Sequence, residues 1–83
     1  MAEEIGVVTH FFSHISVGII EITKGKLRIG DEIHIKGATS DFTQSISSMQ
    51  MEHKRIEEAK KGDSIGLKVK EHVRKHDKVF KVE

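Results

Sequence analysis

Histidine is the residue type with the most obvious chemical potential in this 83-residue sequence. Six histidines are present, and two pairs have i, i+4 spacing, His10 with His14 and His72 with His76. In a helix this spacing brings two imidazoles to one face, where they could bind a metal ion. Neither pair lies in a helical pattern, because the first crosses the end of an apolar run and the second lies in a charged turn. We therefore expect solvated or partly packed histidines and no metal site.

Hydroxyl side chains are the second candidates for chemistry. They cluster at Thr39-Ser40-Asp41 and from Ser45 to Ser48. The first cluster has the composition of a turn and the second alternates like a strand, so neither predicts a nucleophile with its base. The string Gly25-Lys26-Leu27-Arg28-Ile29-Gly30 lacks the Gly-Lys-Ser/Thr ending of a phosphate-binding loop. We expect no catalytic residue, no cofactor and no nucleotide bound by this chain alone.

Basic residues offer a third possibility, RNA binding. Ten of the 14 Lys and Arg residues follow Met51, whereas the 13 Asp and Glu residues are divided almost evenly. Lysines and arginines on one face could meet phosphates, or they could simply keep a solvated sheet edge from aggregating. The four aromatic residues are all Phe, and we expect most of them to lie in the core rather than to stack against nucleic-acid bases. The predicted RNA-contacting set is Lys54, Arg55, Lys60, Lys61, Lys68 and Lys70.

Length and composition limit the framework that could position these residues. A chain of this length predicts one domain, residues 1–83, with a modest core. The absence of cysteine excludes disulfides and thiolate chemistry and fits a reducing compartment. No apolar run approaches the roughly 18 residues of a membrane span, and the acidic start is unlike a signal peptide. We expect a soluble cytoplasmic protein without membrane contact.

Short apolar runs bounded by Gly, Asp or Ser predict an all-β domain. The six expected strands lie at 5–10, 17–22, 32–36, 42–51, 64–70 and 78–82. Within 42–51 the apolar residues change parity, which predicts a bulge near Ser47 and Ser48. The segment 52–61 is interpreted mainly as a connection, although its composition allows one helical turn before Gly62.

Several motifs occur in a specific order along the chain. They are Gly25-Lys-Leu-Arg-Ile-Gly-Asp-Glu-Ile33, Ile46-Ser-Ser-Met-Gln50, Ala59-Lys-Lys-Gly-Asp-Ser-Ile-Gly-Leu67 and Arg74-Lys-His-Asp-Lys-Val79. Together with the opening strands, they resemble domain II of elongation factor Tu and related translational GTPases, over nearly the whole chain from Ile5 to Val82. The resemblance implies a six-stranded antiparallel β-barrel, in agreement with the six runs.

The resemblance also implies partners. In those multidomain factors this barrel touches the GTPase domain, small-subunit ribosomal RNA and, in elongation factor Tu, the aminoacylated end of tRNA. The tRNA pocket is bordered by the segment that matches Glu52 to Lys70. Two residues depart from the family pattern, since Ser64 stands where elongation factor Tu has Asn and His76 replaces the glycine of the closing turn. Similar barrels also occur as free-standing proteins and as appendages of collagenase-like peptidases linked to RNA modification.

We therefore expect a non-enzymatic, translation-elongation-factor-like module that contacts tRNA, ribosomal RNA or a ribonucleoprotein. The alternative is a protein-interaction module that docks on a partner GTPase or RNA-modification enzyme through an apolar edge near Phe11 and Phe12. Phosphate contacts predict binding that weakens steeply with salt, whereas an apolar interface predicts weak salt dependence and loss of binding when a Phe is changed to Ala.

Overall fold

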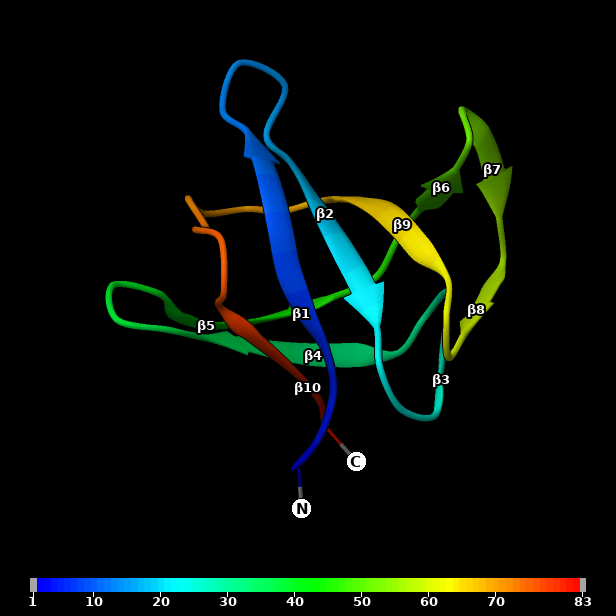
Figure 1. Cartoon of the computed structure of the whole chain (residues 1–83), viewed down its shortest axis with the longest axis horizontal. Coiled ribbons are helices and arrows are strands. Elements are labelled where there is room, and N and C mark those ends of the chain that lie inside the picture. The colour runs from blue at the N-terminus through cyan, green and yellow to red at the C-terminus, as the bar shows by residue number, and fades with distance from the viewer. Residues whose placement is uncertain (1, 83) are drawn as a thin grey trace.

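Strands make up all the regular structure in the computed structural model, which describes residues 2–82 (Figure 1). They are β1 (Ala2–Phe12), β2 (Val17–Ile22), β3 (Lys26–Arg28), β4 (Glu32–Lys36), β5 (Asp41–Ser45), β6 (Met49–Met51), β7 (Lys54–Ile56), β8 (Glu58–Lys60), β9 (Ser64–Lys68) and β10 (Lys78–Val82). In this described part of the chain no helix is long and apolar enough to cross a membrane.

The strands form one large curled sheet and one small ribbon. The large sheet has the order β5-β4-β10-β1-β2-β9-β6-β7, and β3 pairs with β8 in the ribbon. Every pairing is antiparallel. The chain itself links the two ends of the sheet, because β5 continues through residues 46–48 into β6, which pairs with β9. The predicted all-β antiparallel barrel is therefore confirmed.

Most of the six predicted strands appear where the apolar runs placed them. The run at 42–51 is divided into β5 and β6 by a break at 46–48, which is where the parity change predicted an irregularity. Phe42, Ile46 and Met49 are all buried as a result. The possible helical turn within 52–61 is wrong, because this segment contains β7 and β8. These two short strands depend on pairing with β6 and β3, and local helix propensity does not report such pairings.

Alternation along the strands builds the core. Ile33 and Ile35 of β4 and Ile65 and Leu67 of β9 are at most 1% exposed. The inward side chains of neighbouring strands join them in one hydrophobic cluster. This packing leaves the outward positions of β2 and β9 available for a surface site.

The barrel turns three corners with the same four-residue turn. The turns are Arg28–Asp31, Lys60–Asp63 and Arg74–Asp77. In each, the N–H of the fourth residue donates to the carbonyl of the first, and the Asp carboxylate accepts from the first N–H at 2.9–3.0 Å. The third residue has a positive φ, as a type II turn requires, with 96° at Gly30, 96° at Gly62 and 80° at His76. His76 thus keeps the left-handed conformation of the glycine that it replaces.

We predict that His76→Gly stabilises the barrel. A Cβ in the left-handed region costs roughly 1–2 kcal/mol, and glycine removes this strain but gains entropy in the unfolded chain, so the net gain should be about 0.5–1 kcal/mol. Urea unfolding measures the difference, and Gly62→Ala is the matched control that should lower stability. An unchanged midpoint for His76→Gly would mean that the turn is not strained.

Candidate functional site

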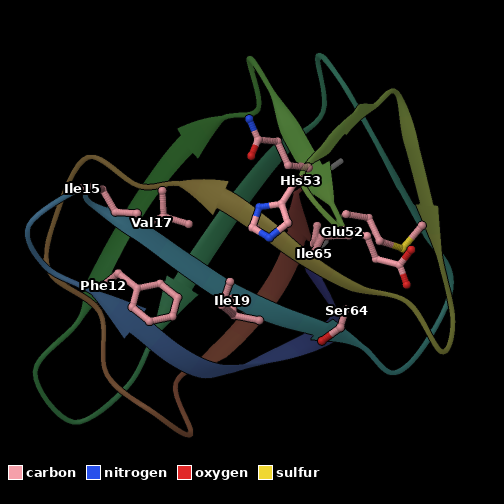
Figure 2. A pocket seen from close by; sticks show the side chains of 11 residues that line it. Phe12, Ile15, Val17, Ile19, Glu52, His53, Ser64 and Ile65 are labelled. Atoms are coloured by element: carbon pink, nitrogen blue, oxygen red, sulfur yellow. The ribbon is translucent and has the colours of Figure 1, made fainter.

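An apolar groove of about 260 Å³ lies on the outer surface between the β1–β2 hairpin and the β6–β7 hairpin (Figure 2). Its floor consists of outward-facing positions of three neighbouring strands. Val17 and Ile19 come from β2, where the alternating residues Gly18 and Ile20 are buried. The floor of the groove is therefore formed by regular strands.

Gly66 makes the floor hollow. The sheet register aligns Gly66 of β9 with Ile19 on one side and Gln50 of β6 on the other. A Cβ at this position would lie 3.5 Å from Val17 Cγ1 and 3.7 Å from Ile19 Cδ1, which is ordinary van der Waals contact. The missing side chain therefore creates the depression without any constraint on the backbone.

One wall of the groove exposes large apolar side chains. Phe12, at the end of β1, is 42% exposed, and Ile15, in the following turn, is 52% exposed. No other large hydrophobic residue within residues 2–82 is classed as exposed. Single exposed apolar side chains are common on protein surfaces, but two of them next to an apolar floor form a patch. Such a patch indicates a binding surface.

The opposite wall is a strained polar turn. Glu52 and His53 form the two-residue connection between β6 and β7, with φ values of 53° and 66°. Such hairpin turns require two positive φ values and normally use Asn-Gly. Non-glycine residues in this conformation cost of order 1–3 kcal/mol each, and such strain clusters at binding sites. Figure 2 shows Phe12 on one side of the floor and this turn on the other.

Two of the predicted cationic residues lie beside the polar wall. Lys54 directly follows the turn, and Arg55 is paired with the groove residue Gln50 across β6 and β7. Both are exposed, and neither takes part in an ion pair among residues 2–82.

Two more cations lie near the apolar wall. Lys68 is paired with Val17 across β2 and β9, and Lys70 follows two residues later. Both lysines line a second hollow of about 330 Å³, together with Ser45 and Ser47. These exposed hydroxyls and ammonium groups form a donor-rich surface that suits an anion.

Lys60 and Lys61 lie apart from the groove. Lys60 is paired with Lys26 in the β3–β8 ribbon, and neither lysine lines the groove. The Arg28 guanidinium also lies on this ribbon, where it donates to Glu58 at 2.8 Å and lowers the pKa of that carboxyl. The structure therefore brings four of the six predicted cations to the two sides of the groove and leaves two elsewhere.

The histidines and hydroxyl residues considered in the sequence are either packed against neighbours or exposed to solvent. His72 packs edge-on against Phe11, with ring centroids 4.6 Å apart. The Ser40 hydroxyl is buried and donates to the His72 carbonyl at 3.2 Å. His10 and His14 are exposed. Within residues 2–82, no three His, Asp or Glu side chains form a group that could hold a metal ion.

Sequence reasoning missed the groove itself. It placed an apolar edge at Phe11 and Phe12, but only Phe12 is exposed, because Phe11 packs against the core. A usable signal was the continuous apolar run of Val17, Gly18, Ile19 and Ile20, which leaves apolar side chains on both faces of one strand. In an antiparallel sheet with one face in water, such a run indicates a contact surface.

Comparisons with known proteins agree with this architecture. Residues 16–79 match the family described as elongation factor Tu domain 2. An uncharacterized protease of Methanocaldococcus jannaschii is 42% identical over 93% of the chain, and a collagenase of Porphyromonas gingivalis is 40% identical over 86%. The C-terminal domain of a protein described as a U32 peptidase, from Geobacillus thermoleovorans, superposes with a TM-score of 0.90 at 21% identity, covering 98% of this chain and 93% of that domain.

These relatives overturn the expectation of a non-enzymatic protein. Those that match most of the chain are named protease and collagenase. The chain spans 19% and 20% of their lengths, so it corresponds to one domain of such proteins. The expectation was wrong because it rested on the lack of a catalytic constellation within 83 residues, which says nothing about the catalytic groups of a much longer protein.

Proposed function

We propose that this chain, which belongs to the elongation factor Tu domain 2 family, is an RNA-contacting barrel in a protein related to the U32 peptidases. In this proposal the groove holds an unpaired nucleotide near the end or in a loop of the RNA. The flanking cations hold the adjacent phosphates.

The single observation that supports this proposal most is the composition of the groove. The apolar floor next to the exposed Phe12 ring suits the face of a base, because stacking on aromatic and apolar surfaces is the usual way to hold unpaired nucleotides. Polar groups of Glu52, His53 and Ser64 at the rim offer partners for the edge of the base and for the ribose. Apolar walls with a few convergent polar groups are the usual composition of a small-ligand site.

The charges around the groove favour a phosphate-bearing ligand over a neutral one. Lys54 and Arg55 lie on one side, and Lys68 and Lys70 lie on the other. A nucleotide in the groove would thus have cations available for the phosphates on either side of it. The groove is also lined by residues 50–53 and 64–66, and most of these lie within the region from Glu52 to Lys70 that resembles the border of the tRNA pocket.

The test is RNA binding by fluorescence anisotropy, with labelled tRNA and a small-subunit ribosomal RNA fragment at two salt concentrations. We expect salt-dependent binding and a loss of at least tenfold in affinity for the double variant Lys68→Glu/Lys70→Glu. The plot of log affinity against log salt should become shallower, with a slope smaller in magnitude by roughly 1–2, since each phosphate contact with single-stranded RNA contributes about 0.7.

The matched control is Lys60→Glu/Lys61→Glu, which changes the net charge equally on the β3–β8 ribbon. It should retain most of the affinity of the unmodified chain. Equal losses in both double variants would mean that only net charge matters, and this would contradict a specific site at the groove.

A second candidate function is docking on a protein partner, and the exposure of Phe12 and Ile15 supports it. The partner would be an enzyme, for example the remaining part of a longer protease-like protein. The same experiment separates the two functions. Absence of RNA binding at low salt would favour the protein partner, whose affinity should depend weakly on salt and fall when Phe12 is changed to Ala.

A further inference from the structure

The barrel has a seam between β5 and β9 that the side chain of Gln44 bridges. At the edge of the sheet, β5 pairs with β4, and β9 on the other side pairs with β2 and β6. No backbone ladder joins β5 to β9 in the part of the chain that the structure describes. Instead, Gln44 Nε2 donates to the Lys68 carbonyl at 2.9 Å, and the Lys70 N–H donates to Gln44 Oε1 at 2.9 Å. The Gln44 amide therefore takes the place of a peptide group in the ladder.

The segment that Gln44 fixes also supports the apolar wall of the groove. The N–H of Val69, between the two residues bonded to Gln44, donates to the Ser16 carbonyl at 2.9 Å. Ser16 has a left-handed φ of 55° and links the exposed Ile15 to the floor residue Val17. A short series of hydrogen bonds thus connects the seam to the hairpin turn that carries the wall.

We propose that Gln44 is a positioning residue for the groove: it holds the end of β9, and through Val69 and Ser16 it fixes Ile15 and Val17. Gln44 does not line the groove, but it lines the second hollow beside Lys68 and Lys70. The inference deepens the proposed function, and it rests on that function only for the consequence on RNA affinity.

The position requires a donor and an acceptor in one planar group. Leucine has a similar size but offers neither. An ionised glutamate can accept from the Lys70 N–H, but it cannot donate to the Lys68 carbonyl, whereas a protonated glutamic acid can do both. The charged groups that line the same hollow are the ammonium groups of Lys68 and Lys70. Gln44→Glu is therefore a conservative variant whose function should return in acid.

The experiment combines NMR spectroscopy of the free protein with RNA binding. For Gln44→Leu we expect faster amide exchange at Val69 and Lys70, by at least tenfold, and shifted methyl signals of Ile15 and Val17. RNA affinity should fall several-fold while its salt slope stays unchanged, because all the lysines remain. At pH 7, Gln44→Glu should lose the bond to the Lys68 carbonyl and therefore shift the Val69 amide signal and the methyl signals of Ile15 and Val17. These signals should return toward those of the unmodified chain when the carboxyl is protonated.

Ser45→Ala is the matched control, because Ser45 lines the same hollow but makes no hydrogen bond to Lys68 or Lys70. It should leave the exchange rates and the methyl signals unchanged. The inference is overturned if Gln44→Leu alters the amides at the seam but not the methyl signals of the groove, or if Ser45→Ala has the same effect. If both sets of signals change but the unmodified chain binds no RNA, the proposed function fails and the positioning role of Gln44 stands.

Discussion

Gly66→Leu is expected to weaken RNA binding substantially while the barrel remains folded. The new side chain would project into the depression between Val17 and Ile19, where the space for a ligand now lies. Loss of the apolar contacts of one base should weaken affinity by roughly 5- to 150-fold, since stacking of a single base is worth about 1–3 kcal/mol.

The fold should tolerate this change for a specific reason. Gly66 is not among the glycines with positive φ, and a Cβ there meets its neighbours at ordinary distances. Glycine also weakens a strand interior, so leucine should leave the unfolding midpoint unchanged or raise it. Gly66→Ala is the matched control, because it adds one methyl group and should reduce affinity only slightly.

The measurement pairs anisotropy with thermal unfolding of each variant. A stable Gly66→Leu barrel that binds RNA as tightly as the unmodified chain would show that the groove is not the RNA site. If the same variant lost affinity for a protein partner instead, the second candidate function would gain support.

Gly6→Ala is expected to lower stability strongly. Gly6 lies in β1 next to a register shift, where it is paired with Ile22 of β2. A Cβ on Gly6 would lie 2.6 Å from the Glu21 carbonyl oxygen and 3.1 Å from Ile20 Cγ2. Because the nearer atom belongs to the backbone of the adjacent strand, one strand must move.

Overpacking of this kind typically costs 1–3 kcal/mol, and the backbone contact puts this case at the upper end, about 3 kcal/mol. That is a large part of the stability of a small domain. Urea unfolding measures the loss, and Gly66→Ala again provides the control, with the same chemical change at an unobstructed site. Equal midpoints for the two variants would mean that β1 and β2 separate easily, contrary to the observed packing.

Much of the fold could be predicted because it depends on local patterns. The alternation of Ile33 with Ile35 and of Ile65 with Leu67 indicates which side of each strand is buried. The Gly-Asp pairs at Gly30 and Gly62 mark the corners, since only a residue that tolerates positive φ fits a type II turn. The parity change before Met49 locates the break between β5 and β6.

The candidate site was only partly predictable, because its residues meet through pairings between distant strands. Cations were recognisable by type, but register decides that Lys68 lies beside Val17 and that Lys60 lies beside Lys26. The two strands in 52–61 escaped notice for the same reason. Residues such as Glu52 and His53 prefer other conformations, and only the hairpin between β6 and β7 forces them into the left-handed region.

By itself, the sequence determined the all-β class, the burial pattern and the corners, because strand periodicity and turn chemistry are properties of neighbouring residues. The tertiary structure alone decided where the groove lies, which four of six cations flank it, and that Gln44 closes the seam. Many of these contacts join residues far apart in the sequence, such as Gln44 with Lys68, which are 24 positions apart, and Phe12 with Gly66, which are 54 apart. Their contacts depend on strand order and register, which the periodicity of a single strand does not contain.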